Sequence, residues 1–113
     1  MANELILIVE DNPKNLKLVR DTLQVKGYQT IEAETGEEGV RLVHERHPAL
    51  ILMDIQLPGM SGIEALQELR ADPVTRPTPV IAGSGANWHE FAPYLDAYVA
   101  VAAPIVDSLP RLT

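Results

Sequence analysis

Three acidic residues follow two strongly apolar segments of this sequence. Glu10 and Asp11 come directly after the apolar residues 5–9, and Asp54 comes directly after the apolar residues 49–53. Short apolar runs of this kind are typical of strands that are buried on both faces of a parallel sheet. Because open α/β sheets bind ligands at the carboxyl ends of their strands, the three carboxylates would converge there if the two strands are neighbours.

Such a cluster favours a bound cation, because neighbouring carboxylates repel one another. A shallow site with a few carboxylate oxygens suits Mg²⁺ better than a calcium cage. One oxygen of Asp54 would stay available to attack a phosphoryl group, while the ion neutralises charge on the transferring oxygens. Ser84 follows another apolar segment, residues 79–82, and its hydroxyl would lie at the same edge to hydrogen-bond a phosphoryl oxygen.

Alternating strand and helix patterns position these residues. Capping signals predict helices that begin after Asn12, Thr35 and Ser61, and we expect Ile63, Leu66 and Leu69 to form the buried face of the third helix. Successive parallel strands need helical crossovers, so the pattern predicts a doubly wound parallel α/β sheet. The predicted strands are residues 5–9, 28–33, 49–53, 79–82 and 97–103.

Composition limits the possible functions. The 113 residues, 46% of them hydrophobic, fit one domain spanning residues 1–113. A net charge of −7 disfavours binding to DNA or to anionic membranes, and the lack of cysteine excludes disulfides and thiolate metal sites. We find neither a secretory signal pattern nor an apolar run near the ~20 residues of a membrane span, so we expect a cytoplasmic protein.

Two motifs resemble the receiver domain of two-component response regulators, in the style of stand-alone, single-domain receivers. The motifs are IVEDN at residues 8–12 and LMDIQLPGMSG at residues 52–62. The acidic pair, the acceptor aspartate, Pro58 and Gly62 all fall in register with the family pattern. The resemblance covers residues 4–84 and implies a flavodoxin-like, five-stranded sheet with strand order 2-1-3-4-5.

The resemblance also implies roles for particular residues. It implies that Asp54 accepts a phosphoryl group from a histidine kinase or phosphotransfer protein. Glu10, Asp11, Asp54 and the main-chain carbonyl of Gln56 would hold Mg²⁺, and Ser84 would occupy the switch hydroxyl position. We expect a signalling protein and not an enzyme. Aspartyl phosphatases usually place a second aspartate two residues after the first, where this chain has Gln56.

Residues 85–113 depart from the family pattern. Receivers carry a lysine just before a proline at the end of strand five, whereas residues 101–104 read VAAP and no lysine follows Lys26. This departure leaves an alternative open, a pseudo-receiver adaptor that acts without phosphate control. The last helix is expected to be shortened or rearranged. The sheet face left uncovered would favour a homodimer through the C-terminal segment.

Overall fold

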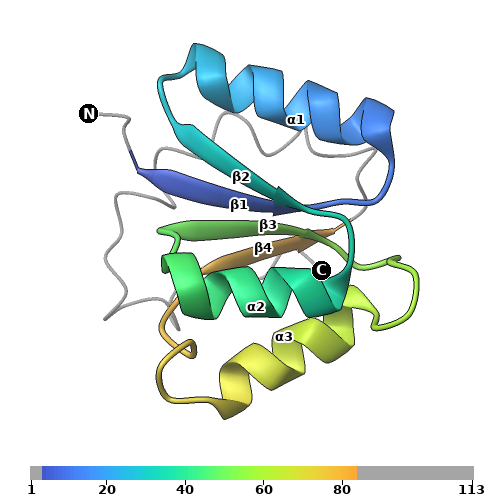
Figure 1. Ribbon diagram of the computed structural model, residues 1–113, viewed down its shortest axis with the longest axis vertical. Coiled ribbons are helices and arrows are strands. Elements are labelled where there is room, and N and C mark those ends of the chain that lie inside the picture. The colour runs from blue at the N-terminus through green and yellow to red at the C-terminus, as the bar shows by residue number, and fades with distance from the viewer. Residues whose placement is uncertain (1–3, 84–113) are drawn as a thin grey trace.

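Four parallel strands in the order β2-β1-β3-β4 form the centre of the computed structural model, which describes residues 4–83 (Figure 1). The elements are β1 (Leu5–Val9), α1 (Pro13–Val25), β2 (Gln29–Ala33), α2 (Gly36–Arg46), β3 (Leu50–Asp54), α3 (Gly62–Ala71) and β4 (Val80–Gly83). The predicted parallel α/β fold and the order of these four strands are confirmed. The predicted fifth strand, the rearranged last helix, Ser84 and the dimerisation segment lie outside the described residues.

The pairing of β1 with β3 brings the two acidic motifs together. Val9 lies opposite Met53 in the parallel register, so the residues that follow them emerge at the same edge of the sheet. On the far side of β3, Asp54 lies opposite Gly83. Strands that are more than 40 residues apart in the sequence are therefore neighbours, as the strand order implied by the receiver resemblance requires.

Two hydrophobic layers cover the two faces of the sheet. Ile6 and Ile8 of β1 pack in the cluster that includes Val19 and Leu23 of α1. The alternate residues of β1 and β3 pack in the second cluster, which includes residues of α2 and α3. Figure 1 shows the same division, with α1 on one face and α2 and α3 on the other. Every second position along β1 and β3 therefore faces α1.

The helices begin where the capping signals predicted. Asn12 caps α1 and Thr35 caps α2, each through its side-chain oxygen. Ser61 and Glu64 form the full reciprocal capping box at the start of α3. None of the helices within residues 4–83 has the length and apolar character needed to cross a bilayer.

The predicted buried face of α3 was wrong at one position. The Ile63 side chain is 52% exposed, and the helix buries Gly62, Ala65 and Leu69, with Leu66 half-buried. The helix is turned so that its smallest residues meet the sheet, which lets its backbone approach β3 closely. Periodicity alone favoured the larger apolar side chains and missed this preference for close contact.

Candidate functional site

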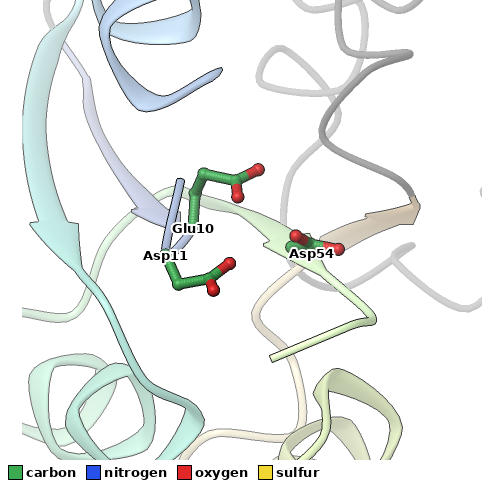
Figure 2. Close-up of side chains that lie close together, drawn as sticks. All are labelled: Glu10, Asp11 and Asp54. Atoms are coloured by element: carbon green, nitrogen blue, oxygen red, sulfur yellow. The ribbon is translucent and has the colours of Figure 1, made fainter. Parts of the chain in front are cut away.

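Glu10, Asp11 and Asp54 form one carboxylate cluster at the carboxyl ends of β1 and β3. One oxygen from each residue lies within 4.8 Å of the others. Glu10 and Asp54 are buried, with exposed fractions of 0% and 7%, whereas Asp11 is exposed. Figure 2 shows the three side chains gathered around one region at the ends of the strands. Burial of two neighbouring carboxylates costs free energy unless a cation or hydrogen bonds offset their charge.

Both the main-chain N–H and the carboxylate of Glu10 form hydrogen bonds with main-chain groups. Its N–H donates to the Ala33 carbonyl at 2.9 Å, which extends the pairing of β1 with β2. Its carboxylate Oε2 accepts the Asn12 N–H at 3.1 Å. Asn12 in turn accepts the Lys14 N–H through its own Oδ1 at 2.9 Å. The Glu10 carboxylate is therefore tied directly to the cap residue of α1.

Asp54 is the last residue of β3, and its neighbours fix its carboxylate. Oδ1 accepts the Gln56 N–H at 2.9 Å. The next residue, Ile55, donates its N–H to the Gly83 carbonyl at 3.1 Å and accepts the Gly62 N–H at 3.2 Å. A carboxylate has about four acceptor sites, so the bond to Gln56 leaves capacity for a metal ion or a new covalent bond.

Gly62 lets α3 begin directly against the site. A Cβ atom at this position would lie 2.7 Å from the Ile55 Cα and closer still to the Asp54 carbonyl oxygen. The loop before α3 also packs on α2, since a Cβ at Gly36 would lie 2.9 Å from the Met60 carbonyl oxygen. The sequence did not reveal the contact between Met60 and Gly36.

The structure places some of the predicted site residues and does not describe Ser84. Glu10, Asp11 and Asp54 lie together, as the sequence predicted. Gln56 adjoins the cluster through its N–H, and the proposed role of its main-chain carbonyl as a metal ligand stays a prediction. Ser84 directly follows β4 in the sequence but lies outside the described residues, so its switch role also stays a prediction.

A second titratable pair lies between α2 and the end of α3. His44 Nε2 is 2.9 Å from Asp72 Oδ2, and its Nδ1 is 3.0 Å from the Val40 carbonyl oxygen. Only the protonated imidazole can donate to both acceptors. The hydrogen bond to Asp72, then that to Val40, raises the pKa of His44, and the same pairing lowers the pKa of Asp72. Residues 28 apart in the chain form this pair, so no local sequence signal pointed to it.

The donor set of the cluster fits a hard divalent cation. All three side chains offer carboxylate oxygens, and their spacing allows one ion to bind an oxygen of each. The exposed position of Asp11 keeps the cluster open to water, which Mg²⁺ retains in most protein sites. The cluster is therefore suited to a shallow Mg²⁺ site.

Comparison with known proteins extends these observations. The family model described as "Response regulator receiver domain" matches residues 6–99. The chain is 51% identical over 77 residues to the polar-differentiation response regulator DivK of Brucella ovis, and 49% identical over 77 residues to that of Brucella anthropi. Each match covers 68% of this chain and 63% of the relative, so it spans less than two thirds of the relatives' length.

Solved structures of receiver domains have the same fold. The receiver domain of the sensor histidine kinase PA1611 from Pseudomonas aeruginosa PAO1, described with a magnesium ion in its active site cleft, is 37% identical with a TM-score of 0.69. That match covers 72% of this chain and 66% of the other. A receiver domain from Syntrophus aciditrophicus is 25% identical with a TM-score of 0.73, covering 96% and 93% of the two chains. Together with the family match and the strand order 2-1-3-4, these similarities establish that the chain belongs to the response regulator receiver domain family and has its flavodoxin-like fold.

Proposed function

We propose that this chain accepts a phosphoryl group on Asp54 in a Mg²⁺-dependent reaction and signals through protein–protein contacts. The observation that supports this proposal most directly is the meeting of Glu10, Asp11 and Asp54 within 4.8 Å. Of the three, Asp54 lies at the end of the central strand β3, with its Oδ1 oriented by the Gln56 N–H. This arrangement leaves the acceptor rigid and reachable from the carboxyl edge of the sheet.

Each residue has a defined role in the proposed reaction. Glu10 and Asp11, with Asp54 and the Gln56 carbonyl, would hold Mg²⁺, which neutralises charge on the phosphoryl oxygens when it is bound. An Asp54 oxygen attacks phosphorus, and the bond from phosphorus to the donor atom breaks. With a phosphohistidine donor the leaving imidazole nitrogen takes a proton, and an acyl phosphate remains on Asp54. The Ser84 hydroxyl would donate a hydrogen bond to the bound phosphoryl group.

The proposed partners follow from family membership. A histidine kinase or a phosphotransfer protein is the expected phosphoryl donor, because the chain belongs to the receiver family and its relatives are named response regulators. The net charge of −7 disfavours direct DNA binding by this chain, and the acidic, cysteine-free composition suits a cytoplasmic location. The partners and the location stay predictions.

Phosphorylation by a small donor tests the proposal. We would incubate the full chain with acetyl phosphate and Mg²⁺ and measure the phosphoryl adduct by intact mass. We expect an adduct that requires Mg²⁺ and that is lost in Asp54→Asn, which keeps the side-chain shape but removes the nucleophilic carboxylate. Asp21→Asn is the matched control, because it changes an exposed aspartate of α1 that pairs with Lys17.

The outcomes separate the proposal from its alternatives. Absence of the adduct in the wild type, or an equal adduct in Asp54→Asn, would overturn the proposed acceptor role. A wild type that binds Mg²⁺ but forms no adduct would instead support an adaptor without phosphate control. Continuous release of phosphate from a generic phosphate ester would indicate a phosphatase.

A further inference from the structure

The phosphoryl-bearing site has more negative charge than Mg²⁺ offsets. Three carboxylates cluster at the site. Transfer converts the Asp54 carboxylate into an acyl phosphate with a charge of roughly −2, so Glu10, Asp11 and this group together exceed the charge of one Mg²⁺ by about two units. Stable binding of the phosphoryl group therefore favours an additional cation at the site.

The strand register shows which face of the sheet Glu10 and Asp54 share. Ile6 and Ile8 of β1 and Leu52 of β3 belong to the hydrophobic cluster that contains residues of α1. Side chains alternate along a strand, so Glu10 and Asp54 occupy the positions that face the α1 side of the sheet. Of the helices within residues 4–83, α1 alone covers this face (Figure 1).

The basic residues of α1 differ in their partners. Lys17 pairs with Asp21, and Arg20 pairs with Glu32 at 3.0 Å. Within residues 4–83, the Lys14 side chain forms no hydrogen bond or ion pair. Lys14 lies in the first turn of α1, where its own N–H donates to Asn12, and Asn12 donates to the Glu10 carboxylate. Lys14 therefore lies on a backbone that is fixed to the site.

Helix geometry directs this side chain toward the site end of α1. The Cα–Cβ bonds of a helix tilt toward its N-terminus, and long side chains lie over the preceding turn. Lys14 is the second residue of α1, so the residues that precede its turn are Asn12 and Asp11. The long, flexible stem and the ammonium group of lysine suit contact with a phosphate as a point charge.

We propose that Lys14 binds the phosphoryl group on Asp54, donating an ammonium N–H to a phosphoryl oxygen and offsetting the remaining negative charge. This role rests on the proposed phosphoryl-acceptor function and adds one binding residue to it. Lys14 should strengthen binding of the phosphoryl group and should not strengthen binding of Mg²⁺, because an ammonium group attracts phosphoryl oxygens and repels the metal ion.

The opposite effects of Lys14 on Mg²⁺ binding and on phosphoryl binding make its role measurable. In Lys14→Gln, we expect the affinity for Mg²⁺ alone to be unchanged or higher by titration calorimetry. The affinity of the Mg²⁺-loaded protein for beryllium trifluoride, a phosphoryl mimic, should fall about tenfold, as should the rate of adduct formation with acetyl phosphate. Lys14→Arg keeps the charge and should restore most of the affinity for the mimic.

Arg46→Gln is the matched control. Arg46 also forms no ion pair within residues 4–83. The substitution removes one positive charge from the last residue of α2. This residue lies close to the start of β3 and so at the opposite edge of the sheet. A long-range charge effect would lower the affinity for the mimic equally in both variants and would overturn the inference. General destabilisation would lower the affinity for Mg²⁺ and the mimic together, which also contradicts a direct contact.

Failure of the two proposals would be distinguishable. If wild type forms the adduct and Lys14→Gln behaves as Arg46→Gln does, Lys14 has no role at the site and the acceptor function of Asp54 stands. If wild type binds neither Mg²⁺ nor the mimic and forms no adduct, the acceptor function is overturned, and the role of Lys14 falls with it.

Discussion

Gly62 lies against the main chain of Asp54, so that the first residue of α3 and the proposed phosphoryl acceptor are in direct contact. A Cβ atom at Gly62 would approach the Ile55 Cα to 2.7 Å, whereas ordinary contacts of this kind are 3.4–4 Å. The obstructing atoms belong to the backbone, so a rotamer change cannot relieve the clash. The position of α3 is therefore set by the same peptide units that present the Asp54 carboxylate.

Substitution of Gly62 by alanine should disturb both stability and the site. We expect Gly62→Ala to lower the free energy of unfolding by about 1–3 kcal/mol, the usual cost of overpacking. The displaced main chain should also weaken Mg²⁺ binding. Urea unfolding and titration calorimetry with Mg²⁺ would measure the two effects.

Ser61→Ala is the control for this substitution. It removes the capping-box hydrogen bond from the Glu64 N–H at 3.1 Å and should cost about 1 kcal/mol. It introduces no atom near Asp54, so the affinity for Mg²⁺ should stay within twofold of the wild type. Equal loss of Mg²⁺ affinity in both variants would show that stability, and not the Gly62 contact, sets the metal site.

Mg²⁺ should stabilise the folded chain by relieving repulsion within the carboxylate cluster. A ligand that binds only the folded state contributes about 2.7 kcal/mol at a concentration of 100 times its Kd. We expect the melting temperature to rise when Mg²⁺ replaces EDTA.

Asp11→Asn tests the source of that stabilisation. Its neutral side chain should make the metal-free protein more stable than wild type, because one of the three clustered charges is lost. The increase in melting temperature with Mg²⁺ should shrink. A metal-free variant that is less stable than wild type would argue against repulsion at this site.

The His44–Asp72 pair should give the chain a pH-dependent stability. The hydrogen bonds to Asp72 and Val40 raise the pKa of His44, so its contribution is fully present below its unfolded-state pKa, near 6.5. That contribution is lost as the pH rises through the higher folded-state pKa. The lowered pKa of Asp72 acts in a separate window, where stability is lost as the pH falls through the folded-state value, below 3.8.

His44→Gln checks this assignment. Urea unfolding between pH 5.5 and 8.5, spanning roughly the window set by the unfolded-state pKa of histidine, should show that stability falls with rising pH in wild type and falls less in the variant. Asp72→Asn should flatten the profile in the same way, because it removes the charge that favours the imidazolium. The idea fails if both variants keep the slope of the wild type.

Thr75 should anchor the turn that leads into β4. Its hydroxyl is buried and donates to the Leu69 carbonyl at 2.7 Å. Thr75→Val keeps the shape and leaves this carbonyl unpaired, which should cost about 1–3 kcal/mol in urea unfolding. Thr22→Val, which removes an exposed hydroxyl bonded to the Leu18 carbonyl, should change stability by less than about 0.5 kcal/mol.

The sequence was most informative where local chemistry determines structure. The apolar runs before Glu10 and Asp54 predicted buried strands, and both strands are fully buried at their carboxyl ends. Asn12 and Ser61 predicted helix starts because each caps the nearby main chain through its own side chain. The acidic cluster followed from these elements once the two strands were assumed to be neighbours, and the register supports that assumption.

Apart from the acidic cluster, side-chain packing between distant segments was beyond sequence reasoning. Ile63 was predicted to be buried because it is large and apolar, yet the close packing of Gly62 and Ala65 turned the helix the other way. The bond between His44 and Asp72 joins two helix ends whose approach depends on the whole α2–α3 packing. These features depend on backbone separation, which the pattern of apolar residues does not encode.

The alignment of Val9 with Met53 also has a consequence for how the chain tolerates change. The spacing of the acids is set by the hydrogen-bond ladder between two strands and not by a loop, so it exists before any ion or donor arrives. Insertion or deletion of one residue within either strand would move Glu10 or Asp54 to the opposite side of the sheet while leaving the composition almost unaltered. The length of these two strands is therefore constrained by the chemistry at their ends.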